Sequence, residues 1–160
     1  MAIVIYGLIG YPLSHSGSES WFADKLRNEG KAGYLYKKLP LASLDEFPSI
    51  LDKYPDLKGL NVTIPYKEKI IPRLEELDPK AEKIGSVNTI LIHREEGKVH
   101  LKGFNTDADG FLQSADFSRH RQALILGTGG AAKAVAYALA ETGISFLFVS
   151  RSKRSETHLK

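Results

Sequence analysis

The stretch that most limits the possible fold classes is residues 123–149, which read ALILGTGGAAKAVAYALAETGISFLFV. The apolar run 123–126 is typical of a buried strand and ends directly at a glycine-rich turn. Apolar residues then recur with the spacing of one helix face up to Leu139, and Gly143 ends the helix. A second apolar run, 144–149, completes a β-α-β unit, so the sequence predicts an α/β fold.

The turn in this unit, GTGGAA at residues 127–132, fits the G-x-G-x-x-A pattern of dinucleotide-binding folds. Gly127 permits the tight turn, and Gly129 lets the backbone approach a diphosphate. The helix that follows presents free N–H groups and the positive end of its dipole. We therefore expect Gly127, Gly129, Gly130 and Ala131 to bind a dinucleotide. A glycine turn without a ligand is the alternative.

The residues after the second strand bear on the choice of dinucleotide. NAD-binding folds usually place Asp or Glu there, yet no acidic residue lies between Glu141 and Glu156. Hydroxyls and cations occupy the position instead: Ser150, Arg151, Ser152, Lys153 and Arg154. Such groups suit a 2′-phosphate, so we expect NADP, bound by Ser150, Arg151, Ser152 and Arg154. A solvent-exposed basic tail is the alternative.

Upstream of this unit, strands and helices alternate, which favours a largely parallel sheet. Strands are expected at 3–9, 34–39 and 57–64, with helices opening at Ser18 and after Ser43. Two helical stretches, 67–77 and 79–83, are expected next. The runs 87–93 and 99–104 then predict a hairpin, and a helix follows from Asp107.

The polar segment 114–122 separates this first part from the glycine-turn unit. We expect two domains, a substrate domain over 1–115 and the truncated start of a Rossmann domain over 116–160. A single β-α-β unit of about 30 residues cannot bury its own sheet faces or strand edges. Exposed edges of this kind favour self-association, so a homodimer is expected.

Composition excludes several classes of function. The chain has 160 residues, 42% of them hydrophobic and 26% charged, as in ordinary soluble proteins. A net charge of +3 predicts no nucleic-acid partner. With no cysteine and five scattered histidines, no metal site is expected. No apolar run approaches the roughly 20 residues of a membrane span, so no membrane partner is expected. We expect a cytoplasmic location.

Four polar clusters precede the glycine turn: GYPLSHSGS at 10–18, NVTIPYK at 61–67, GSVNT at 85–89 and NTDADG at 105–110. In this order, followed by the dinucleotide turn, they resemble the shikimate dehydrogenase family over nearly the whole chain. The resemblance implies a reversible, NADPH-dependent reduction of 3-dehydroshikimate to shikimate, a step of chorismate and aromatic amino-acid biosynthesis. It implies a small-molecule substrate.

Ser16 and Ser18 stand at the start of a predicted helix. Two hydroxyls and free N–H groups can hold a carboxylate, and the resemblance assigns them to the carboxylate of the substrate. N-capping of the helix is the alternative.

Asn61, Thr63 and Lys67 lie where a predicted strand ends, which is where α/β sheets bind ligands. The strand alternation places Asn61 and Thr63 on one face. Judged by spacing alone, Lys67 is a solvated lysine on the same helix as Lys69. The resemblance makes Asn61 and Thr63 substrate contacts and Lys67 both a substrate contact and the general acid and base.

Asp107 opens a helix and by itself fits an N-cap. The resemblance pairs it with Lys67, as a catalytic and substrate-binding residue, and adds Asn88 as another substrate contact. Gly110 suggests that something approaches this helix closely, because glycine costs a helix about 1 kcal/mol relative to alanine.

Two other functions stay open at this stage. One is a quinate/shikimate dehydrogenase that uses NAD. The other is a substrate-binding fragment without turnover, because the family normally continues well beyond Arg154.

Overall fold

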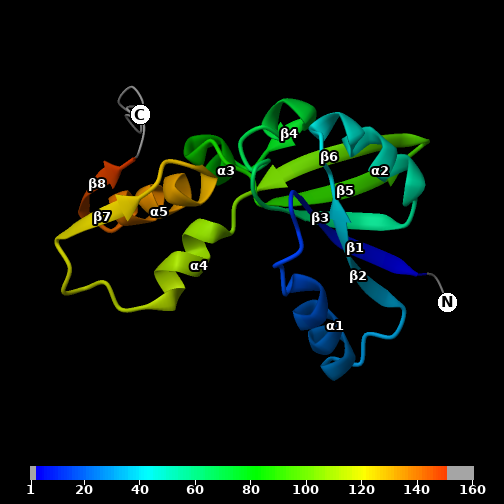
Figure 1. Cartoon of the computed structure of the whole chain (residues 1–160), viewed down its shortest axis with the longest axis horizontal. Helices are drawn as coiled ribbons and strands as arrows, with labels where there is room; N and C mark the ends of the chain where they lie inside the picture. The colour runs from blue at the N-terminus through cyan, green and yellow to red at the C-terminus, as the bar shows by residue number, and fades with distance from the viewer. Residues whose placement is uncertain (1–2, 151–160) are drawn as a thin grey trace.

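The computed structural model describes residues 3–150, which form one six-stranded sheet and one two-stranded sheet (Figure 1). The larger sheet has the order β2-β1-β3-β5-β6-β4. Its strands are β1 (Val4–Gly10), β2 (Tyr34–Pro40), β3 (Leu57–Val62), β4 (Glu76–Leu77), β5 (Thr89–Glu95) and β6 (Lys98–Phe104). The pairings β1–β2, β1–β3 and β4–β6 are parallel, whereas β3–β5 and the hairpin β5–β6 are antiparallel. The predicted α/β fold with a mostly parallel sheet is confirmed.

Helices cover both faces of this sheet. These are α1 (Ser18–Asn28) on one face and α2 (Phe47–Lys53) on the other. The remaining helices are α3 (Pro79–Ile84), α4 (Asp107–Ser114) and α5 (Gly130–Glu141), and there are 3₁₀ turns η1 (Leu44–Glu46) and η2 (Ile71–Arg73). Strand alternation in β1 separates the two sides. Ile9 packs in the main core with Phe47 of α2, whereas Leu8 packs in a smaller cluster with Phe22 of α1.

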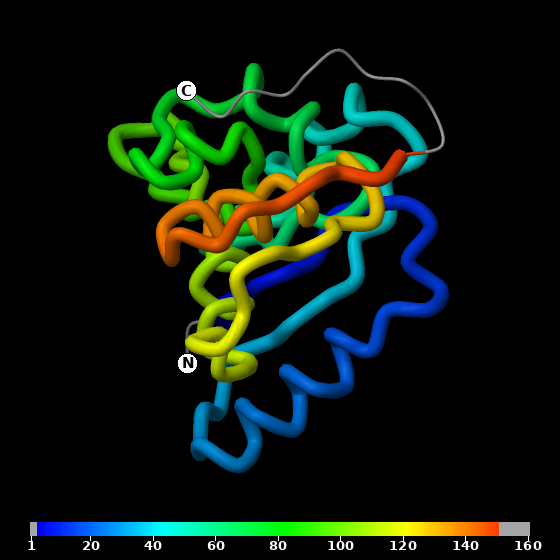
Figure 2. Tube along the Cα trace, turned by 90° about the vertical axis from the view of Figure 1, so that its left-hand side faces the viewer, coloured from blue at the N-terminus to red at the C-terminus, as the bar shows by residue number. Residues whose placement is uncertain are grey.

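The second sheet consists of β7 (Gln122–Leu126) and β8 (Ser145–Val149), which pair in parallel and are joined by α5. Figure 2 views the molecule from this end, with β7 and β8 side by side. One side of α5 packs on this sheet through Ala136 and Leu139. The opposite side packs through Ala134 and Ala138 on α3 and α4. Because alanine keeps the backbones close, α5 is buried on two sides, which explains its alanine-rich sequence.

The helix expected over 67–77 is wrong. The structure has turns there, the short 3₁₀ turn η2, and then strand β4 at Glu76–Leu77 beside β6. Pro72 accounts for the difference, because proline lacks an N–H and its ring would clash with the carbonyl of Glu68 in an α-helix. Lys67 therefore lies in a turn and not on a helix.

The close approach expected at Gly110 is also absent from the described part of the chain. A Cβ atom placed on this exposed residue would have no atom within 4 Å. Gly103 on β6 is the opposite case. A Cβ atom there would lie 2.6 Å from Leu74, 2.9 Å from Leu77 and 2.9 Å from Val87. The missing side chain lets the segment around β4 pack on the sheet.

These two glycines give a matched test of the fold. We expect Gly103→Ala to lower the free energy of unfolding by about 1–3 kcal/mol, because the added methyl overpacks the core. Gly110→Ala should raise it by up to about 1 kcal/mol, because alanine favours the helix and has room. Urea denaturation of both variants measures the difference, and equal stabilities would contradict this packing.

Candidate functional site

The candidate site is a row of polar side chains that runs from the segment after β1, past β2 and the end of β3, to the start of β5 and the segment after β6. It begins at α1, where the Ser16 hydroxyl donates to Ser18 Oγ at 3.1 Å and accepts the Ser18 N–H at 3.3 Å. The N-cap residue of α1 is Gly17, so neither serine occupies that position. The two hydroxyls thus lie together at a helix N-terminus, where they can donate hydrogen bonds to an anion.

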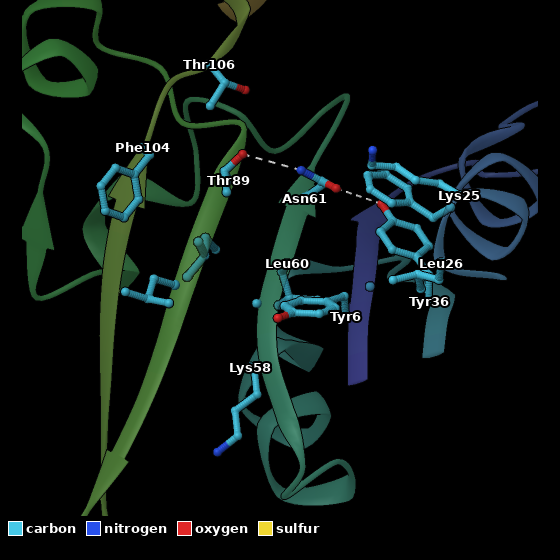
Figure 3. A pocket seen from close by; sticks show the side chains of 15 residues that line it. Tyr6, Lys25, Leu26, Tyr36, Lys58, Leu60, Asn61, Thr89, Phe104 and Thr106 are labelled. Carbon is cyan, nitrogen blue, oxygen red and sulfur yellow. Dashed lines mark hydrogen bonds between the residues drawn. The ribbon is translucent and has the colours of Figure 1, made fainter. Parts of the chain in front are cut away.

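Tyr36 continues the row from β2. Its hydroxyl donates to Asn61 Oδ1 at 2.8 Å, and the Asn61 amide donates to Thr89 Oγ1 at 3.3 Å (Figure 3). Burial raises the pKa of Tyr36 to about 12, opposed in part by a hydrogen bond with Ser18. The phenol therefore stays protonated and links the serines to the end of β3.

Asn88 organises the far end of the row. Its Nδ2 donates to Asp107 Oδ1 and to Thr106 Oγ1, both at 2.8 Å, and its Oδ1 accepts the Thr106 N–H at 2.9 Å. The other oxygen of Asp107 accepts from Lys67 Nζ at 2.7 Å. The Lys67 and Asp107 side chains are 19% and 30% exposed, so the ion pair is shielded yet reachable by a ligand.

Asn105, which sequence reasoning left out of the site, fixes the start of α4. Its side-chain oxygen accepts the N–H groups of Asp107 and Ala108, and its amide donates to the carbonyl of Ser86. Thr106 is the N-cap residue of α4, and the side chain of Asn105, one position earlier, accepts the first N–H groups of the helix, so the Asp107 carboxylate is left to face Lys67. Because Asn105 is only 4% exposed, a role in positioning fits it better than one in binding.

Thr63 is not joined to this row. In the part of the chain that the structure describes, its hydroxyl makes no hydrogen bond, while its N–H donates to Ile9 and its methyl lies against Gly10. Two residues that the sequence did not single out, Tyr36 and Thr89, do belong to the row. Thr89 stands in the GSVNT cluster next to Asn88, so its position beside a predicted site residue could have identified it. Tyr36 had no such signal, because it lies in an ordinary strand.

A cavity of about 530 Å³ lies over the sheet face next to this row. Its walls are mostly apolar, from Tyr6, Phe22, Leu60 and Leu91 among others, and its polar side includes Asn61 and Thr89 (Figure 3). Lys67 and Asp107 do not line it. The cavity therefore shares Tyr36, Asn61 and Thr89 with the polar row, while the Lys67–Asp107 ion pair lies outside its lining.

The glycine turn leads into α5 as expected. Gly127 has φ +111°, which favours glycine, and a Cβ on Gly127 or Gly129 would meet no atom of the described residues within 4 Å. Gly129 and Ala131 are exposed, so a diphosphate could approach the helix N-terminus there. Gly130, in contrast, is buried. These features fit a dinucleotide at this turn.

The remaining expected cofactor residues fall at the end of the chain. Ser150 directly follows β8 and is exposed. Arg151, Ser152 and Arg154 lie outside the described residues. Among residues 3–150, no three His, Asp or Glu side chains are grouped to hold a metal ion. Over the same range, no helix has the length and apolar character of a bilayer span.

Fold and site together define an α/β sheet with a row of polar side chains beside it, followed by a glycine-turn β-α-β unit. The family model of the shikimate dehydrogenase substrate-binding domain matches residues 8–90, which is more than half of the chain. The chain belongs to the shikimate dehydrogenase family.

Curated relatives and solved structures agree with this membership. The NADP(+) shikimate dehydrogenase of Syntrophomonas wolfei is 45% identical over 89% of this chain and 49% of its own length. That of Carboxydothermus hydrogenoformans is 40% identical over 91% of this chain and 52% of its own length. The Thermus thermophilus enzyme, solved with shikimate, has a TM-score of 0.80 and 34% identity over 94% of this chain and 57% of that one. The chain thus spans about half the length of the curated relatives it matches.

The raised pKa of Tyr36 predicts a loss of stability in alkaline solution. An unfolded tyrosine ionises near pH 10, while folded Tyr36 keeps its proton up to about pH 12. The unfolded state therefore binds fewer protons in this window, so the free energy of unfolding falls as pH rises from 10 to 12.

Tyr36→Phe should make that decline shallower, whereas Tyr11→Phe, at a side chain 52% exposed, should not. Denaturant unfolding of the three proteins at a series of alkaline pH values measures the slopes. Parallel slopes for wild type and Tyr36→Phe would show that Tyr36 is not protected from ionisation.

Proposed function

We propose that this chain binds shikimate and 3-dehydroshikimate and supplies the acid–base machinery for their interconversion with NADP(H). The observation that carries the proposal is the shielded Lys67–Asp107 pair at 2.7 Å, held by Asn88 at the strand ends. The Thermus thermophilus relative, whose structure was also solved with NADP(H) and shikimate, supports the same pair of ligands.

The reaction moves one hydride and one proton: 3-dehydroshikimate, NADPH and a proton give shikimate and NADP⁺. Bound NADPH supplies the hydride that converts the ketone carbon to an alcohol. Lys67 Nζ donates a proton to the ketone oxygen, which becomes the hydroxyl, and the amine takes it back in the oxidation direction. Asp107 orients the ammonium and accepts a hydrogen bond from a substrate hydroxyl.

The other end of the polar row fits the substrate carboxylate. Ser16 and Ser18 offer two hydroxyl donors at the N-terminus of α1, which favours a negative charge. Asn61 and Asn88, between the serines and the ion pair, would contact the ring hydroxyls. The row therefore matches a molecule with a carboxylate at one end and hydroxyls along it. We propose Thr63 as a further contact, with its hydroxyl available to substrate.

The cofactor is proposed to lie on the glycine turn. Gly127, Gly129, Gly130 and Ala131 lie at the N-terminus of α5, where backbone N–H groups would hold the diphosphate. Ser150, Arg151, Ser152 and Arg154 follow β8, where hydroxyls and cations suit a 2′-phosphate. This preference for NADP agrees with the NADP(+) enzymes among the relatives.

The decisive experiment measures shikimate binding and turnover separately on this 160-residue chain. Calorimetry gives the affinity for shikimate, and the absorbance of NADPH reports the reduction of NADP⁺ or, in parallel, of NAD⁺. Binding with turnover supports the whole proposal. Binding without turnover reduces it to a substrate-binding chain, and absence of binding contradicts it. Faster reduction of NAD⁺, or oxidation of quinate, would favour the quinate/shikimate alternative.

Lys67→Ala should lower turnover by about 10²–10⁴-fold, the usual contribution of a positioned acid or base, and leave shikimate affinity within a few-fold. Lys69→Ala is the matched control, because Lys69 is an exposed lysine two residues away in the same turn. Turnover of Lys67→Ala within a few-fold of wild type would rule out its catalytic role.

A further inference from the structure

Gly130, the first residue of α5, lies directly against Lys67. A Cβ atom on Gly130 would be 2.8 Å from Lys67 Cβ, 3.4 Å from Lys67 Cδ and 2.4 Å from Ser86 Oγ. Two of these distances are shorter than any real Cβ contact, so the helix can pack here only because Gly130 has no side chain. The glycine turn thus contacts the stem of the lysine in the polar row.

A second contact joins the same two segments one helical turn further along. Lys133 Nζ forms an ion pair with Glu68 Oε2 at 2.6 Å, and both side chains are partly shielded, at 25% and 34% exposed. Glu68 directly follows Lys67, whose own carbonyl accepts the Val87 N–H at 2.7 Å. The first turn of α5 therefore contacts consecutive residues of the Lys67 turn.

The other member of the catalytic pair is tied to the same helix. Ala134 and Ala138 of α5 pack with Ala108 and Phe111 of α4, the helix that Asp107 begins. Helix α5 thus touches the backbone elements on both sides of the Lys67–Asp107 ion pair. Because this packing is close and made through small residues, a shift of α5 would be passed on to both partners.

We propose that Gly130 is a positioning residue for Lys67, with the Glu68–Lys133 ion pair holding the two segments in contact. The proposal rests on the proposed function in that it takes Lys67 to be the proton donor. It deepens that function, because the turn that would hold the diphosphate of NADP is the turn that positions Lys67. Binding of the cofactor at the turn and the position of Lys67 are then coupled, so a change in one alters the other.

Gly130→Ala tests the proposal without any ligand. In the chain labelled with ¹³C-lysine, the ε-CH₂ signal of Lys67 is assigned by its loss in Lys67→Arg. We expect Gly130→Ala to displace this signal, because the new methyl pushes on the lysine stem. Gly129→Ala is the matched control, since a Cβ there meets no atom within 4 Å in the part of the chain that the structure describes, and it should leave the Lys67 signal in place. An unmoved Lys67 signal in folded Gly130→Ala would overturn the proposal.

A double variant separates Lys67 from the other neighbour. Ser86 is fully buried, and its hydroxyl has no hydrogen-bond partner among residues 3–150. Ser86→Ala therefore removes the shortest contact and breaks no hydrogen bond within that range. In Ser86→Ala/Gly130→Ala the contact with Lys67 Cβ remains, and we expect the displaced signal to remain. If the Lys67 signal returned to its wild-type position in this double variant, the displacement would be due to Ser86. That result would overturn the role of Gly130 in positioning Lys67.

Lys133→Met covers the case in which Gly130→Ala does not fold. It removes the ion pair with Glu68 at a partly exposed position, and we expect the Lys67 signal to move. If Gly130→Ala does not fold and Lys133→Met leaves the Lys67 signal unchanged, the proposal is overturned.

Turnover gives a separate readout. Gly130→Ala should lower kcat for shikimate oxidation by about 10–100-fold, the cost of misplacing a catalytic group by about 1 Å, with KM for shikimate within about twofold. A large rise in KM with unchanged kcat would contradict positioning of the proton donor. Absence of turnover in wild type would refute the proposed function alone, because the NMR comparison decides the role of Gly130 without it.

Discussion

The carboxylate of Asp107 is the group on which the site depends. One of its oxygens accepts from Asn88 and the other from Lys67, so its position sets the direction of the ammonium. Lys67 and Asp107 are 40 residues apart in sequence and meet because strand pairing brings their segments together. Asn88 lies between those segments, with its carbonyl bonded to Val62 at the end of β3 and its N–H to Phe104 at the end of β6. The antiparallel part of the sheet thus builds the ion pair.

Close packing by small residues joins the two parts of the molecule. Alanines on opposite sides of α5 let it contact the small sheet on one side and α3 and α4 on the other. Gly130 extends this contact to the Lys67 turn. The glycine turn therefore has two structural faces, an exposed one at Gly129 that is open to a ligand and a buried one at Gly130 against the polar row. Under the proposed function, the turn that would bind the cofactor lies next to the Lys67–Asp107 pair that would move the proton.

Much of the fold could be predicted from the sequence, because apolar periodicity reports directly on strands and helices. The parallel strands, the β5–β6 hairpin and the glycine-turn unit all follow from such patterns. The prediction was wrong over 67–77, where apolar and charged residues gave a helical spacing. Pro72 and the packing of Leu77 against Gly103 outweighed it. The assignment of Ser16, Asn61, Asn88 and Asp107 to one site depended on the resemblance to a family, since each alone also fits a cap or a solvated position.

By itself, the sequence determined the α/β class, the glycine turn and the family, because these are local patterns of spacing and residue type. Tertiary structure alone decided which polar groups meet. It placed Tyr36 between Ser18 and Asn61, directed the Asn105 side chain to the first N–H groups of α4, and packed Gly130 against Lys67. Contacts of this kind depend on strand order, register and helix packing, which bring together residues that are far apart along the chain. No spacing within the sequence encodes that proximity.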